Sequence, residues 1–118
     1  MAALAAYSEG ELWLEACLHY LEENRNYLAA YVAAHMPGIR LVLPEATYLA
    51  WLDCREAGLR EKAAQFFLDC AGVALNEGAT FGRGGEGFVR LNFGCSRAML
   101  TRALNCMASA LRISARPA

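Results

Sequence analysis

The feature that most constrains the fold is one long stretch, from Glu11 to His35, that contains neither proline nor glycine. Ser8 and Glu11 lie three residues apart at its start, the spacing of a capping box, in which each side chain satisfies a free backbone N–H. Pro37 ends the stretch. The pattern predicts one helix that begins at this capping box and runs to His35, about 26 residues or roughly 39 Å long, which is long for so small a chain.

Apolar residues lie on two different sides of this predicted helix. One stripe contains Leu14, Cys17, Leu18, Leu21, Leu28 and Val32, and the other contains Trp13, Ala16, Tyr20, Tyr27 and Tyr31. A helix that is apolar on two sides needs two surfaces to pack against. One surface is expected to be a sheet of this chain. The other we expect to come from outside it.

The middle of the chain predicts a hairpin and a second helix. Ile39 to Leu43 and Tyr48 to Asp53 are rich in β-branched and aromatic residues and are separated by a short turn, so they predict two antiparallel strands. Apolar residues recur at helical spacing from Leu59 to Ala71. Gly72 follows at the position where a helix commonly ends in a left-handed conformation.

The last part of the chain predicts two further strands and a final helix. Val73 to Leu75 is a strand stub, and a glycine-rich loop from Asn76 to Gly87 leads to an alternating strand, Phe88 to Phe93. Ser96 is the predicted N-cap of a helix with an apolar face of Leu100, Ala103, Leu104, Met107 and Leu111, and residues 114–118 form a frayed tail. The predicted fold is a single α+β domain, a small and mostly antiparallel sheet packed with helices behind a long N-terminal helix.

Charge and cysteine content exclude several classes of function. The net charge is −1, with no basic patch, which argues against nucleic acid or an anionic membrane as a partner. No apolar run is long enough to cross a bilayer, and the first residues lack the basic start of a signal peptide. The five cysteines form no C-x-x-C pair and have no metal-ligand spacing to a histidine. They therefore indicate a reducing cytoplasm and argue against a metal site.

The loop at 82–87 matches the dinucleotide-binding pattern G-x-G-x-x-G letter for letter. That pattern needs a strand before it and a helix after it, so that the helix N-terminus can bind the pyrophosphate. Here a strand follows. A surface loop that acts as a lid is therefore the better interpretation.

Arg90 is the strongest candidate for a ligand-binding residue. It lies in the middle of a predicted strand between Val89 and Leu91, where a charge close to buried surface needs an anion. The guanidinium group forms two parallel hydrogen bonds with a carboxylate and stays charged at any working pH. The residues alone leave open whether the partner is a ligand or a structural ion pair.

Four motifs in the same order resemble the small domain of the MalY/PatB group of pyridoxal-phosphate (PLP) enzymes. This group consists of cystathionine β-lyase-like carbon–sulfur lyases within the class I/II aminotransferase superfamily. The motifs are AYSEG followed by WL and YLEENR, then PEATYLAWLD at 44–53, AGVALNEGATFG at 71–82 and GFVRLNF at 87–93. They cover about residues 5–111.

The resemblance implies that Arg90 binds the α-carboxylate of an amino-acid substrate, with Phe81, Tyr48 and Asn92 as possible residues of the site mouth. It implies PLP as the cofactor of the parent enzyme, held by a large domain absent from residues 1–118. We expect no PLP bound to this chain, because its only lysine, Lys62, lies outside any PLP-lysine motif. We also expect the chain alone to be inactive and to form a homodimer. An aminotransferase parent, and a non-catalytic amino-acid-binding or self-associating module, remain as alternatives.

Overall fold

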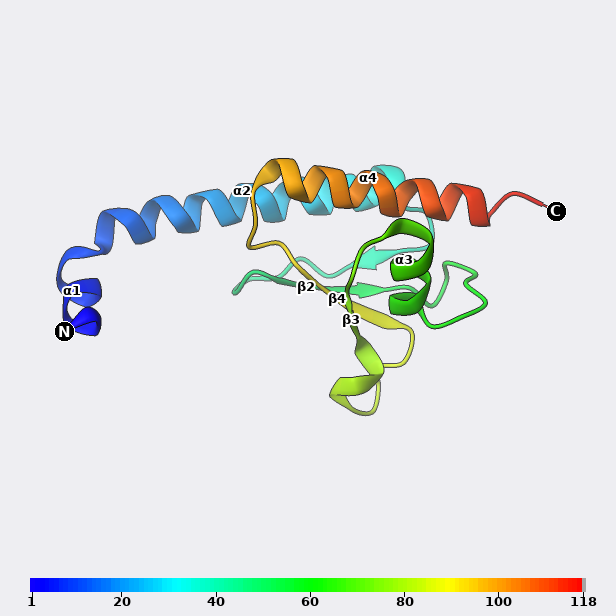
Figure 1. Ribbon diagram of the computed structural model, residues 1–118, viewed down its shortest axis with the longest axis horizontal. Helices are drawn as coiled ribbons and strands as arrows, with labels where there is room; N and C mark the ends of the chain where they lie inside the picture. Colours follow the sequence, from blue (N-terminus) through cyan, green and yellow to red (C-terminus); the bar gives the residue numbers. More distant parts are fainter. Residues whose placement is uncertain (118) are drawn as a thin grey trace.

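The computed structural model describes residues 1–117 as four helices and a four-stranded sheet (Figure 1). The elements are α1 (Ala2–Glu9), α2 (Glu11–His35), β1 (Arg40–Leu41), β2 (Leu49–Asp53), α3 (Ala63–Ala71), β3 (Asn76–Glu77), the 3₁₀ helix η1 (Gly78–Phe81), β4 (Phe88–Asn92) and α4 (Arg97–Ser114). The strand order is β1-β2-β4-β3, and every neighbouring pair is antiparallel. The predicted α+β fold with a small antiparallel sheet is confirmed.

One core lies between the helices and one face of the sheet. Along β2 and β4 every second residue faces it, so that Ala50 and Leu52, and Val89 and Leu91, are buried. The helices contribute Leu28 and Val32 from α2, Phe66 and Phe67 from α3, and Leu100, Leu104, Met107 and Leu111 from α4. Most of the apolar face predicted for the last helix is therefore correct, and Ala103 is only half-buried.

The two halves of α2 have different surroundings. Its C-terminal half packs beside α4, whereas its N-terminal half and α1 extend beyond the rest of the molecule (Figure 1). Leu28 and Val32 are buried, but Trp13, Leu14 and Leu18 are 71%, 50% and 55% exposed. The two predicted apolar stripes therefore do not each pack against a different surface. In the C-terminal (inner) half of α2 residues of both stripes pack against this chain, and in the N-terminal (outer) half residues of both stripes are exposed. We call residues 1–20 the arm.

The predicted capping box is wrong. Ser8 lies in the last turn of α1, where its hydroxyl donates to the carbonyl of Leu4. The helical structure is interrupted at Gly10, and α2 begins at Glu11. Residues 2–6 are good helix formers, so they extend helical structure upstream of the predicted start. Gly10 lies close to α1, because a Cβ added there would be 2.5 Å from the carbonyl oxygen of Ala6.

Other predicted boundaries move by a few residues. The third strand is Asn76–Glu77 rather than the stub at 73–75, and α3 begins at Ala63. Gly72 adopts the left-handed conformation, with φ 67°, and Ser96 caps α4 by accepting a hydrogen bond from the Met99 N–H, as predicted. The first residue of the tail predicted at 114–118 is the last residue of α4, and residue 118 lies outside the described part of the chain. Within residues 1–117, no helix is long and apolar enough to cross a membrane.

Candidate functional site

The second face of the sheet lies opposite the core and carries aromatic and charged side chains. Trp51 and Asp53 on β2, and Phe88 and Arg90 on β4, alternate with the buried residues of their strands and are half-buried. The rings of Trp51 and Phe88 stack at a centroid distance of 5.2 Å. In Figure 1 the helices α2, α3 and α4 lie on the core side of the sheet, whereas on this face Phe81 of η1 contacts Trp51.

Arg90 lies at the centre of this face. The antiparallel register places it opposite Trp51 on one side and opposite Asn76 on the other. Its guanidinium lies over the ring of Phe81, 4.6 Å from the centroid, and Phe81 in turn makes an edge contact with Trp51 at 6.0 Å. A guanidinium held over an aromatic face gains a cation–π contact and loses freedom to move.

The positive charge of Arg90 has no counterion among residues 1–117, where no carboxylate oxygen lies within 4.0 Å of it. Its Nη2 donates to Asn76 Oδ1 over a long 3.4 Å. Its Nε is buried and has no hydrogen-bond partner. A buried donor without a partner costs free energy, which an acceptor from outside the chain would recover.

The structure separates the four predicted site residues into two pairs. Phe81 contacts Arg90 directly, whereas Tyr48 and Asn92 line a neighbouring pocket of about 690 Å³ between α2 and the ends of β2 and β4. Asn92 is two residues after Arg90 on the same face of β4. Its Oδ1 accepts the N–H of Gly94 at 2.8 Å, so it already has a structural role.

The glycine-rich loop at 82–87 forms consecutive tight turns that join η1 to β4. The Gly85 N–H donates to the Gly82 carbonyl, and the Phe88 N–H donates to the Gly85 carbonyl. Gly78 and Gly85 touch backbone to backbone, since a Cβ on Gly78 would lie 2.3 Å from the Gly85 oxygen. The three glycines of the pattern, Gly82, Gly84 and Gly87, have φ of 117°, 86° and 85°, so the turns of this loop account for the letter match without any nucleotide.

Sequence reasoning missed two residues of the site, Trp51 and Asn76. Both are defined by their pairing with Arg90, and pairing across strands depends on the register. For Trp51 a signal existed, because it lies in the middle of a predicted hairpin strand. Asn76 fell in a segment predicted to be loop, so no pattern pointed to it.

Residues 1–106 match the sequence profile of the family described as aminotransferase class I and II. The chain belongs to the class I and II aminotransferase family. Two curated relatives are cystathionine beta-lyase PatB of Bacillus subtilis, 41% identical over 108 residues, and protein MalY of Escherichia coli K12, 39% identical over 112 residues. These matches cover 91% and 94% of this chain.

The structural match is equally extensive. The PLP-bound C–S lyase from Staphylococcus hominis superimposes with a TM-score of 0.86 and 37% sequence identity over 95% of this chain. The chain spans only 28% of PatB, 29% of MalY and 30% of the lyase chain. It therefore corresponds to less than a third of these aminotransferase-family relatives, and PLP is the cofactor named for the lyase structure.

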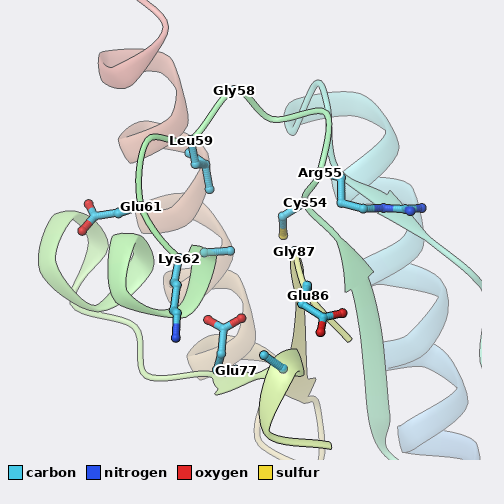
Figure 2. A pocket seen from close by; sticks show the side chains of 11 residues that line it. Cys54, Arg55, Gly58, Leu59, Glu61, Lys62, Glu77, Glu86 and Gly87 are labelled. Atoms are coloured by element: carbon cyan, nitrogen blue, oxygen red, sulfur yellow. The ribbon is translucent and has the colours of Figure 1, made fainter. Parts of the chain in front are cut away.

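The surroundings of Lys62 do not fit PLP. Lys62 precedes α3 and lines a cavity of about 310 Å³ together with Glu61, Glu77 and Glu86 (Figure 2). Glu77 accepts the N–H of Ala64 in the first turn of α3, so the helix start already has an anion. The carboxylates of Glu77 and Glu86 lie on the cavity side and repel a phosphate group, whereas that of Glu61 points away from the cavity (Figure 2). The residues of this aminotransferase-family chain therefore form no cofactor site around its lysine.

Proposed function

We propose that this chain is the C-terminal, substrate-clamping small domain of a PLP-dependent carbon–sulfur β-lyase that acts on cystathionine or similar cysteine conjugates. In this proposal Arg90 binds the substrate α-carboxylate. The cofactor, its lysine and its phosphate site belong to a large domain outside residues 1–118. The identity to PatB and MalY over most of this chain, together with the small share of each that it covers, supports the proposal.

The observation that carries the proposal is the uncompensated charge of Arg90. Its Nε is buried and unpaired, and its one hydrogen bond, to Asn76, is long. Two parallel N–H donors of a guanidinium match the two oxygens of a carboxylate, and both bonds strengthen when water is excluded. The role of this chain is thus to hold and orient the substrate, and to close over it.

The test is a chimaera in which this chain replaces the matching segment of Bacillus subtilis PatB. Elimination from cystathionine breaks the Cβ–S bond and releases a free thiol, and water hydrolyses the remaining three-carbon imine to pyruvate and ammonium. We expect the chimaera to release thiol and pyruvate in equal amounts. A folded, PLP-loaded chimaera that releases neither would contradict the proposal.

The same chimaera addresses the aminotransferase alternative. Transamination leaves the Cβ–S bond intact and gives an amino group to a keto acid, so it produces no free thiol. The non-catalytic alternative predicts measurable heat on titrating the isolated chain with amino acids in the absence of PLP. Our proposal predicts at most very weak binding there, because Arg90 supplies only one side of the site.

We propose in addition that the isolated chain forms a homodimer through the arm. The arm, residues 1–20, contains three of the twelve acidic residues and none of the eleven basic ones, so the remainder carries eleven basic against nine acidic residues. The apolar, acidic arm therefore complements the second sheet face of another copy, where Arg55 and Arg90 flank the aromatic rings. Tyr27, on the second apolar stripe of the helix, is half-buried beneath the Arg97 guanidinium, so the proposed contact does not include it.

Analytical ultracentrifugation tests the homodimer. We expect association that weakens with salt, and that is lost in Leu14→Glu/Leu18→Glu. Leu68→Glu, which changes an equally exposed leucine on α3, is the matched control and should leave association unchanged. A monomer at high concentration and low salt would contradict the homodimer.

We further propose a cytoplasmic location. The odd number of cysteines and the absence of paired spacing in the sequence support a reducing compartment. Fractionation of cells that express the tagged chain tests this location, and recovery outside the cytoplasmic fraction would contradict it.

A further inference from the structure

Asn24, on the inner half of α2, is the one fully buried polar residue among residues 1–117. Its Nδ2 donates to two backbone carbonyls, that of Phe93 at 3.1 Å and that of Cys95 at 2.8 Å. Its Oδ1 accepts the Nε–H of Arg97 at 2.8 Å. Both amide hydrogens and the amide oxygen therefore have partners, and these partners allow only one orientation of the amide group.

The three partners of Asn24 belong to one short segment, residues 93–97, which connects the end of β4 to the start of α4. Two more residues of α2 hold the same segment. The Tyr20 hydroxyl accepts the backbone N–H of Arg97 at 2.7 Å, and the Tyr27 ring lies 4.7 Å below the Arg97 guanidinium. Tyr20, Asn24 and Tyr27 are four and three residues apart, so they share one face of the helix.

This segment follows directly on the strand that carries Arg90. β4 runs from Phe88 to Asn92, and its pairing with β2 and β3 makes it rigid. Fixing residues 93–97 to α2 therefore fixes the position of Arg90 relative to α2. The outer half of the same helix belongs to the arm, in which Trp13, Leu14 and Leu18 are exposed.

We infer that Asn24 is a positioning residue, which fastens the end of β4 to α2 so that the arm and the Arg90 guanidinium move as one rigid unit. One consequence rests on the proposed function of Arg90: when the arm is displaced, the carboxylate-binding guanidinium moves with it. An apolar residue at position 24 would leave two carbonyls and the Arg97 Nε–H unpaired in a dry environment. Aspartate would keep the acceptor for Arg97 but face two carbonyl oxygens without a donor.

The test is nuclear magnetic resonance on the 118-residue chain, with Asn24→Asp as the variant and Asn26→Asp as the control. Asn26 is on the same helix but exposed, so it undergoes the same chemical change without the buried contacts. We expect Asn24→Asp to speed hydrogen exchange of the Arg97 amide about tenfold or more, in line with the loss of buried hydrogen bonds. We also expect the resonance of the Arg90 Nε–Hε group to shift and the α2–β4 orientation, from residual dipolar couplings, to become averaged. Amides of α3 and of the β1–β2 pair should keep their protection.

Two results would overturn the inference. One is a uniform loss of protection over the whole chain, which would make Asn24 a general stabilising residue. The other is an unchanged α2–β4 orientation and an unchanged Arg90 signal. If Asn24→Asp does not fold, Tyr20→Phe removes only the acceptor of the Arg97 N–H and should produce the same local changes with smaller amplitude. None of these readouts depends on whether Arg90 binds a carboxylate, so failure of the proposed function would be seen separately in the chimaera.

Discussion

Trp51 and Arg90 face one another across the two central strands of the sheet, and Phe81 contacts both of them. The indole and the phenyl ring form a wall beside the guanidinium. The wall shields one side of Arg90 from water, while no acidic residue in the described part of the chain neutralises it. The face of the sheet turned away from the core thus carries a positive charge without a counterion among residues 1–117.

Arg90 substitutions in the PatB chimaera are expected to lower kcat/KM strongly. Removing one partner of a desolvated charge pair costs about 2–5 kcal/mol, so Arg90→Ala should lower kcat/KM by roughly 30- to several-thousand-fold. Arg90→Lys should fall between wild type and Arg90→Ala, because it keeps the charge but loses the two-point geometry. Arg83→Ala, in the exposed loop, is the control and should be near wild type. If Arg90→Ala unfolds the domain while the remaining folded enzyme keeps its KM, Arg90 is a structural residue.

Asp53 should make stability depend on pH in acid. Hydrogen bonds from the Arg55 guanidinium, at 2.9 and 2.8 Å, lower the pKa of Asp53 from 3.8 to about 2. A carboxyl whose pKa is lower in the folded state contributes stability above its unfolded pKa, and this contribution disappears between about pH 4 and pH 2. The effect should be small, because Arg55 is 62% exposed.

Thermal unfolding from pH 7 to pH 2 measures the Asp53 contribution. Asp53→Asn should lower the melting temperature at neutral pH, and its difference from wild type should shrink as the pH falls through this window. Asp69→Asn, on the exposed surface of α3, serves as the control. A difference for Asp53→Asn that stays constant down to pH 2 would show that the ion pair does not contribute.

Cys54 should be the least reactive of the five cysteines. Burial, with smaller contributions from the charges of Asp53 and Glu77, raises its pKa from 9.0 to about 12. Since the thiolate is the reacting species, only roughly one molecule in ten thousand is reactive at pH 8. Iodoacetamide followed by mass spectrometry should show Cys70 and Cys106, which are exposed, modified first. Native-state labelling of Cys54 at the rate of Cys70 would contradict the burial argument.

The isolated chain should not bind PLP through Lys62. The carboxylates of Glu77 and Glu86 lie beside the cavity that this lysine lines, and they repel the phosphate of the cofactor (Figure 2). Titration with PLP should give only the absorbance of the free aldehyde and its weak, nonspecific adducts, and Lys62→Ala should behave identically. A stable new absorbance that is lost in Lys62→Ala would show that a cofactor site exists in this chain.

Much of the fold could be predicted because local patterns agree with the tertiary structure. The alternation in Phe88–Phe93 placed Val89 and Leu91 in the core, Gly72 ended α3, and Ser96 capped α4. Each depends on a few neighbouring residues. The capping box at Ser8 failed because several good helix formers upstream form a helix of their own, α1, which has Ser8 in its last turn and ends before Gly10.

The site could be predicted only in part. Arg90 followed from its place in the strand and from the resemblance to PLP enzymes. Its neighbours Trp51 and Asn76 did not, because register decides which residues face one another across strands. Tyr48 and Asn92, which the resemblance gives as possible residues of the site mouth, line a pocket next to the face that carries Arg90, and which residues share that pocket depends on the tertiary structure.

The sequence by itself determined which segments form helices and strands, which strand faces are apolar and to which family the chain is similar, since these depend on residue order and periodicity. Only the tertiary structure decided where the long helix is covered and how Asn24 joins α2 to the end of β4. A contact such as that between Asn24 and Cys95 spans 71 positions in sequence, and it exists because the whole fold brings two backbone carbonyls to one buried amide group.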